Sequence, residues 1–137
     1  MSSILQDIWF IKENSGIVLL HREYNKDFQP QLFGGLMSAL NSFAKGLDED
    51  GLSSFELDDK KYCFKKCDGI ISIASTSKDE DDKKVNSKLE RLLNLFLKRY
   101  SKEFFKSWDG NIEAFSEFQE KIKEETETQV KQFWNGF

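Results

Sequence analysis

Residues 4–24 contain two apolar runs separated by a turn-like segment. Both runs, 4–12 and 17–24, carry apolar side chains at odd and at even positions. Between them, Asn14 and Gly16 tolerate the positive φ angles that hairpin turns need. A strand that is apolar on both sides must be covered on both sides. The pattern therefore predicts an antiparallel hairpin in a sheet that is buried on both faces.

A helix is predicted over residues 30–47. Pro30 suits a first helical turn, and Gly46 suits the end of a helix. At about 100° per residue, the apolar side chains fill one wide arc: Leu32, Phe33, Leu36, Met37, Ala39, Leu40, Phe43, Ala44 and Leu47. We expect this arc to pack on the sheet. We expect the opposite arc to face outward: Gln31, Gly34, Gly35, Ser38, Asn41, Ser42 and Lys45.

Three further strands are predicted over residues 52–57, 60–67 and 70–76. Asp68-Gly69 is a strong signal for a tight hairpin between the last two strands. The middle run alternates apolar and polar side chains, which places it nearer an edge of the sheet. The last run is apolar on both faces, as expected for a central strand.

Helical periodicity dominates the rest of the chain. Across residues 84–105, apolar side chains recur at helical spacing: Val85, Leu89, Leu92, Leu93, Phe96, Leu97, Tyr100 and Phe104. Trp108, Asp109 and Gly110 interrupt this pattern, and a last helix starts near Asn111. The order ββαβββαα predicts an α+β fold. We expect an α-β-α sandwich, in which a five-stranded antiparallel sheet has one helix on one face and two on the other.

Length and charge restrict the possible functions. A chain of 137 residues is long enough for one domain with a real core. Its net charge of −4 gives no basic surface for nucleic acid. No apolar run is long enough to span a membrane, and the first residues lack a secretory signal. We expect a cytoplasmic protein with one domain over residues 1–125 and an aromatic tail or helix extension over 126–137.

Side chains that could carry out chemistry are sparse. The chain has one histidine, His21, and two cysteines, Cys63 and Cys67. Four residues apart on one strand, the two cysteine Cα atoms would lie about 13 Å apart, beyond the ~7 Å limit of a disulfide. No glycine-rich phosphate loop is present, and the acidic run at 78–84 lacks the glycine and final glutamate of a calcium loop. We expect no catalytic residue, no cofactor and no metal site.

The segment IWFIKENSGIVLLHREY, followed by QPQLFGGLMSALNSFAKGL, resembles the start of longin domains. It is similar both to stand-alone longin proteins found in archaea and to longin subunits of eukaryotic trafficking complexes. The resemblance spans roughly residues 4–125. It implies a profilin-like fold and a non-catalytic module that binds proteins. Partners of such modules include small GTPases, SNARE helices and other longin domains, often in membrane traffic. The sequence shows no heptad-rich helix after the domain, so a vesicle-fusion role is not expected.

The expected outward arc of helix 30–47 is small and uncharged. No charged residue occurs from Phe28 to Ala44, although 32% of the chain is charged. Small side chains allow another backbone to approach closely, and the lack of charge lowers the cost of desolvation. We therefore predict a partner-binding surface on this arc, formed by Gln31, Gly34, Gly35, Ser38, Asn41 and Ser42. The predicted partner is the chain itself, another longin or roadblock-type subunit, or a small GTPase.

Three alternatives stay open at this point. A PAS-like sensor of small molecules shares the first elements of the fold, but it needs a cavity beside the sheet. The uncharged arc could also be a plain solvent-facing surface. The aromatic residues of the tail, Val130, Phe133, Trp134 and Phe137, could pack on the domain itself, enter a groove of a partner or lie on a membrane.

Overall fold

The computed structural model describes residues 5–13, 15–22, 29–48, 51, 53–57 and 59–123. A five-stranded antiparallel sheet forms its middle layer, built from β1 (Ile8–Lys12), β2 (Val18–Arg22), β3 (Ser54–Glu56), β4 (Lys60–Cys67) and β5 (Ile70–Ser77). The strand order is β2-β1-β5-β4-β3. The predicted tail over 126–137 and the domain boundary at 125 lie outside the described residues.

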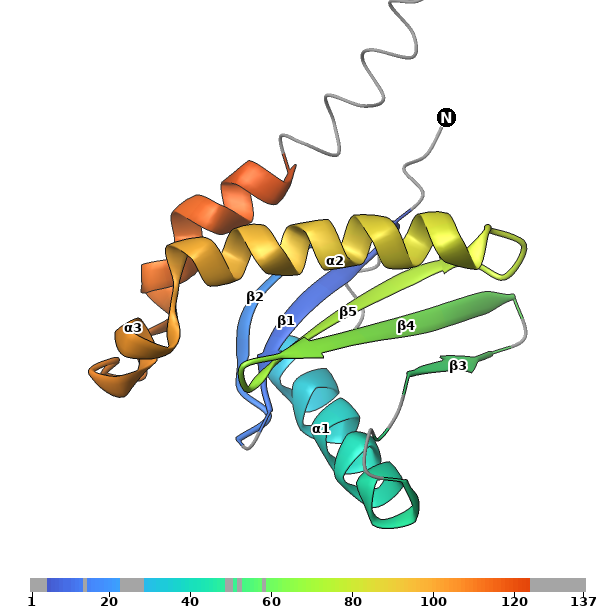
Figure 1. Cartoon of the computed structure of the whole chain (residues 1–137), viewed down its shortest axis with the longest axis horizontal. Helices are drawn as coiled ribbons and strands as arrows, with labels where there is room; N and C mark the ends of the chain where they lie inside the picture. The colour runs from blue at the N-terminus through green and yellow to red at the C-terminus, as the bar shows by residue number, and fades with distance from the viewer. Residues whose placement is uncertain are drawn as a thin grey trace, which may run out of the picture.

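Helices cover both faces of the sheet (Figure 1). The helix α1 (Pro30–Leu47) lies on one side, and α2 (Asp82–Arg99) crosses the other side. The second side is completed by α3 (Lys102–Lys106), the 3-10 helix η1 (Ile112–Phe115) and a helical segment over residues 116–123. The predicted α-β-α sandwich of order ββαβββαα is confirmed. Within the part of the chain that is described, no helix is long and apolar enough to cross a membrane.

The central strand is β5, which pairs with β1 on one side and with β4 on the other. Its residues from Ile70 to Thr76 are all buried, as the apolar pattern predicts. The turn into β5 has two residues, Asp68 and Gly69, and both have positive φ angles of 54° and 79°. Such a turn matches the twist of the strands that it joins.

The helix expected over residues 84–105 is divided into α2 and α3. The break falls at Tyr100 and Ser101, and the Ser101 hydroxyl accepts a hydrogen bond from the backbone N–H of Phe104 (3.4 Å). A serine at this position caps a new helix, because its oxygen satisfies an N–H group that has no partner within the helix. The chain can therefore change direction here and bring its aromatic side chains onto the core.

The sheet separates two apolar clusters. The larger lies under α2 and η1, where Phe96 and Phe115 pack with their ring centroids 5.7 Å apart. The smaller lies on the α1 side, and Trp9 stacks there on Phe33 at 4.1 Å. Among the buried members of this smaller cluster, α1 contributes Phe33 and Met37. The contact between α1 and the sheet is therefore narrow.

The orientation of α1 differs from the expectation. The large side chains of the apolar arc are mainly exposed: Leu32, Leu36, Leu40, Phe43 and Leu47. The buried residues of this helix are Phe33, Gly34, Met37 and Asn41. The expectation that the whole apolar arc faces the sheet is wrong. At ~100° per residue, the buried residues are centred about a quarter turn around the helix axis from the middle of the apolar arc. Gly34 and Asn41, expected on the outside, face inward.

A close backbone contact explains this orientation. A Cβ atom on Gly34 would lie 2.5 Å from the carbonyl oxygen of Gly16 and 2.5 Å from Cγ2 of Val18. The face of α1 that carries Gly34 therefore rests directly on the turn between β1 and β2 and on the start of β2. A larger side chain there would push the helix away from the sheet.

This contact gives the first prediction. Gly34→Ala should lower the free energy of unfolding by about 1–3 kcal/mol, because the added methyl group overpacks the contact. Gly35→Ala is the matched control, since a Cβ at Gly35 meets no atom within 4 Å. The control should raise stability by about 0.5–1 kcal/mol, because alanine favours a helix over glycine. Urea unfolding of both variants measures the difference, and equal effects would contradict the close contact.

Candidate protein-interaction surface

The outward face of α1 carries a row of large apolar side chains. Leu32 is 70% exposed, Phe43 73% and Leu47 81%, and Leu36 and Leu40 continue the row at 57% and 40%. We call these five residues the apolar ridge. Scattered exposed apolar residues are normal on a protein surface, whereas a contiguous group usually marks a binding site. The apolar ridge is therefore the candidate functional feature of the chain.

Small residues run along one side of the apolar ridge. Gly35, Ala39, Ser42 and Gly46 are all exposed and recur at helical spacing. At Gly35 and Gly46 an added Cβ would meet nothing within 4 Å, so the space above them is open. We call these four residues the small-residue groove. The outer face of α1 thus places a row of large side chains beside a row of small ones.

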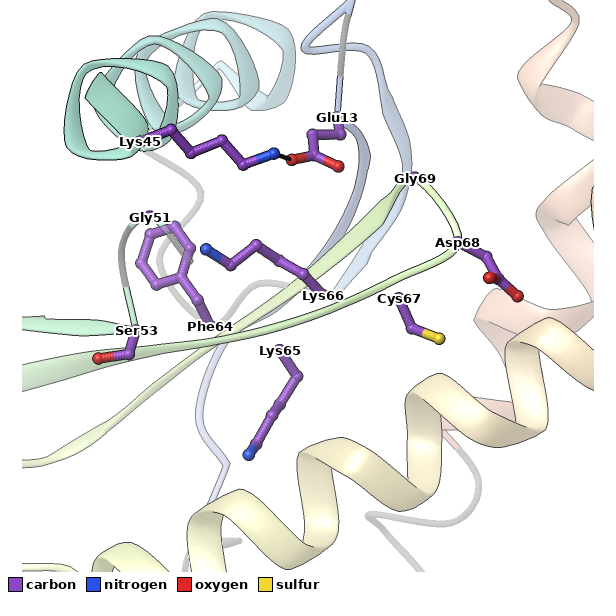
Figure 2. A pocket seen from close by; sticks show the side chains of 10 residues that line it. All are labelled: Glu13, Lys45, Gly51, Ser53, Phe64, Lys65, Lys66, Cys67, Asp68 and Gly69. Carbon is purple, nitrogen blue, oxygen red and sulfur yellow. Dashed lines mark hydrogen bonds and ion pairs between the residues drawn. The ribbon is translucent and has the colours of Figure 1, made fainter. Parts of the chain in front are cut away.

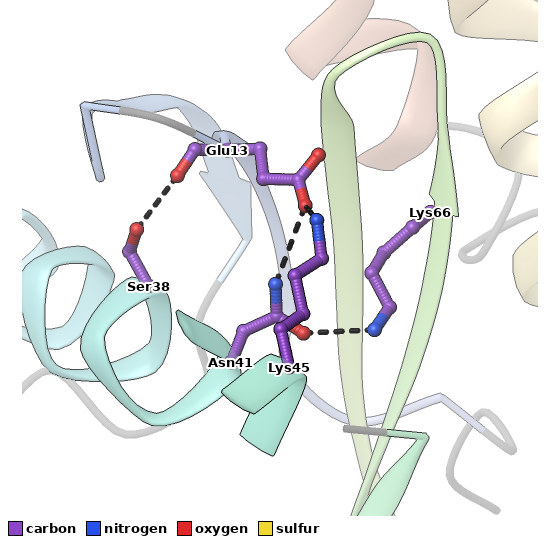
Figure 3. A network of polar contacts seen from close by, with 5 residues as sticks. All are labelled: Glu13, Ser38, Asn41, Lys45 and Lys66. Atoms are coloured by element: carbon purple, nitrogen blue, oxygen red, sulfur yellow. Dashed lines mark hydrogen bonds and ion pairs between the residues drawn. The ribbon is translucent and has the colours of Figure 1, made fainter. Parts of the chain in front are cut away.

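A polar network holds the inner face of α1 (Figure 3). Glu13, which follows β1, accepts hydrogen bonds from Ser38 at its carbonyl oxygen (2.7 Å) and from Asn41 at its carboxylate (3.4 Å). Its carboxylate also pairs with Lys45. The Asn41 side chain in turn accepts a hydrogen bond from Lys66 of β4 (2.8 Å). Three successive turns of α1 are therefore tied to the sheet by polar contacts.

The residues that sequence patterns singled out as partner-binding fall into two groups. Gly34 and Asn41 are buried, and Ser38 is half-buried with its hydroxyl bonded to Glu13. Gly34 and Asn41 are therefore covered within the chain itself. Gln31, Gly35 and Ser42 are exposed, and a role for any of the six in binding a partner stays a prediction. The apolar ridge was missed because its leucines were assigned to the core.

The sheet has two edges, and they differ. The outer edge beyond β4 is formed by β3. In the β3–β4 ladder, Leu57 donates to Lys60 and Phe64 donates to Ser53. Along an edge strand of an antiparallel sheet, the backbone N–H and C=O groups of successive residues point alternately toward the neighbouring strand and away from it. The backbone groups of Ser54 and Glu56 consequently point away from the sheet, where the described residues provide no further strand.

A shallow hollow of about 440 Å³ lies beside the polar network (Figure 2). Figure 2 shows Phe64 and Lys66 on the α1 side of β4, whereas Lys65 and Cys67 point toward α2. Three of its charged side chains hold α1 in place: Glu13 pairs with Lys45 of that helix, and Lys66 donates to Asn41 of the same helix. This arrangement favours a role in fixing α1. It does not resemble the cavity beside the sheet that a small-molecule sensor needs.

The reactive side chains show no catalytic grouping within the described residues. Cys63 and Cys67 are free thiols, and Cys63 is buried. Burial raises the pKa of the Cys63 thiol, although the nearby Lys61 and Lys65 partly oppose this effect. A thiol with a raised pKa is a poor nucleophile near neutral pH. No group of three or more His, Cys, Asp or Glu side chains in the described part of the chain could hold a metal ion.

The family of first longin domains of FUZ, MON1 and HPS1 matches residues 8–108. The chain belongs to this longin family. The match covers the sheet, α1 and α2, so the resemblance seen in the first hairpin and helix extends over most of the domain. The family identifies the chain as a longin-type protein-interaction module. A search of the curated proteins finds no match.

Solved roadblock-type structures share this fold. The Roadblock/LC7 domain from Streptomyces avermitilis is 16% identical with a TM-score of 0.54, and the match covers 70% of this chain and 84% of that one. Myxococcus xanthus MglB is 10% identical with a TM-score of 0.52, over 67% and 83% of the two chains. A structure described as MglB with tetrameric arrangement is 16% identical with a TM-score of 0.51, over 66% and 73%. At these identities the likeness concerns the fold.

The polar network gives the second prediction. Asn41→Ala should lower the free energy of unfolding by about 1–3 kcal/mol, because Glu13 and Lys66 each lose a partner in a partly buried position. Ser42→Ala, at the exposed neighbouring position, should change it by less than about 0.5 kcal/mol. Thermal or urea unfolding compares the two. A loss of similar size in both variants would contradict a specific role for Asn41.

Proposed function

We propose that this chain is a non-catalytic assembly module, which pairs through the outer face of α1 and the open β3 edge with a second domain of longin or roadblock type. The second domain that this surface fits best is another copy of the same chain. The exposed apolar ridge is the observation that carries the proposal. Leaving five large apolar side chains in water is unfavourable, and association removes that cost.

The shape of the surface favours a second copy as the occupant. When two helices pack, rows of side chains on one fit between rows on the other. The apolar ridge and the small-residue groove lie side by side on α1, so a twofold axis would place each ridge against the partner's groove. A twofold interface requires this self-complementarity, because both subunits present the same surface.

The lack of charge on this surface also favours a second copy of the chain as the partner. Apart from Lys45, which pairs with Glu13, α1 carries no charged residue. Two copies therefore meet without like charges facing each other and with little polar desolvation. A partner with a strongly charged helix would find no complementary charge along the apolar ridge.

The β3 edge offers a second contact on the same protomer. Phe55 stacks on Tyr62 with ring centroids 4.8 Å apart on the α1 side of the sheet. Leu57 lies two residues after Phe55 and therefore on the same side of the sheet. Its side chain is 53% exposed. The backbone groups of Ser54 and Glu56 that point away from the sheet can pair with an added strand. Helix and strand contacts together would make the interface larger than either alone.

A small GTPase or a trafficking protein is the further partner that the longin family implies. In this proposal the paired modules form a platform that binds or regulates such a partner, in the cytoplasm or at a membrane reached through the partner. Specificity would come from the shape of the assembled surface, with no bond-making step in the chain itself.

The third prediction tests the pairing. Phe43→Lys should reduce self-association at least about tenfold, because a charge in the apolar ridge must be desolvated on pairing. Ile112→Lys is the control, since it introduces the same lysine in place of an apolar residue that lies outside α1 and is 43% exposed. Light scattering behind a sizing column gives the mass of each protein over a range of concentrations. Unchanged association in Phe43→Lys, or equal loss in both variants, would exclude the apolar ridge as the interface.

A further inference from the structure

The second edge of the sheet, formed by β2, is occupied by side chains of the same molecule. The backbone N–H of Val18 donates to the Oε1 atom of Gln31 (2.9 Å), and the Nε2 atom of Gln31 donates to the carbonyl oxygen of Val18 (3.1 Å). One carboxamide therefore satisfies both backbone groups of one strand residue. A neighbouring β-strand would make the same pair of contacts.

The two Val18 groups are those that point away from the sheet. The N–H of Lys12 in β1 donates to the carbonyl oxygen of Ile17 (2.9 Å), so Ile17 faces β1. The next residue, Val18, must then present its own groups to the outside. Gln31 thus covers a position at which an added strand would begin to pair.

A second glutamine approaches the same edge from the other side of the sheet. The backbone N–H of His21 donates to Oε1 of Gln119 at 3.4 Å. Gln31 belongs to α1, whereas Gln119 lies in the helical segment over residues 116–123 on the opposite face. The β2 edge is therefore held between two helices, each of which supplies one carboxamide.

We propose that Gln31, assisted by Gln119, plugs the β2 edge and so restricts strand addition to the β3 edge. An unpaired sheet edge is a template for pairing with another chain, and proteins commonly protect such edges. A sheet that can add strands at both edges can grow without limit, whereas one with a single open edge stops at a closed pair. This inference does not depend on the pairing through α1, because the plug consists of contacts within one chain.

The decisive variant is Gln31→Met. Methionine keeps the length of the side chain and its preference for a helix, but it cannot make the two carboxamide hydrogen bonds. Gln29→Met is the matched control, because Gln29 is exposed at the start of the same helix and makes no side-chain capping hydrogen bond. Both variants add one methionine to the surface, so only the loss of the plug distinguishes them.

Amide hydrogen exchange by NMR reads the plug directly. In dilute Gln31→Met, the Val18 amide should exchange at least about tenfold faster than in the natural sequence, while Gln29→Met should leave it unchanged. Unchanged Val18 exchange in Gln31→Met would overturn the proposal. Gln119→Met removes the contact to His21, so the His21 amide should exchange faster in that variant. This second variant keeps the proposal testable if Gln31→Met does not fold.

The mass of the protein in solution shows whether loss of the plug allows further assembly. At high concentration, Gln31→Met should reach at least about twice the mass of the natural protein at the same concentration, as opened β2 edges pair with each other. The Val18 amide should then become protected again. Faster Val18 exchange without any gain in mass would show that Gln31 satisfies the backbone but does not limit assembly, and this part of the proposal would be wrong.

Discussion

The close approach of Gly34 to the turn between β1 and β2 sets the position of α1, and much of the surface depends on it. Because a Cβ at Gly34 would lie 2.5 Å from atoms of Gly16 and Val18, the face of the helix that carries it can lie directly on the hairpin. Glu13 then reaches Ser38 and Asn41 on the same face. A narrow contact made of glycine and polar side chains thus orients an 18-residue helix.

This orientation of α1 exposes one surface and covers another. The apolar ridge is turned away from the sheet and becomes available to a partner. Gln31, one turn before Gly34, reaches the backbone of Val18 and closes the β2 edge. Under the two proposals, the same helix presents one surface for assembly, the apolar ridge, and blocks another, the β2 edge. A role in binding other proteins agrees with the longin family to which the chain belongs.

The layers of the fold could be predicted from the sequence because their signals are local. The apolar runs gave a sheet buried on both faces, and Asp68-Gly69 gave the hairpin. The orientation of α1 could not be predicted, since its apolar arc is wider than the face that the sheet can cover. Which part of that arc is buried depends on Gly16 and Glu13, which lie outside the helix. The plug at Val18 is likewise a contact between distant residues, with no pattern in the sequence to reveal it.

The measurement that tests this account most directly is the reactivity of thiols placed on the two sides of α1. In a Cys67→Ser background, Leu36→Cys and Met37→Cys place one thiol each at adjacent positions that are 57% and 3% exposed. In dilute solution, the thiol at position 36 should react with an alkylating reagent at least about tenfold faster than that at position 37. Equal rates, or a faster reaction at position 37, would contradict the orientation on which the proposed interface and the plug both depend.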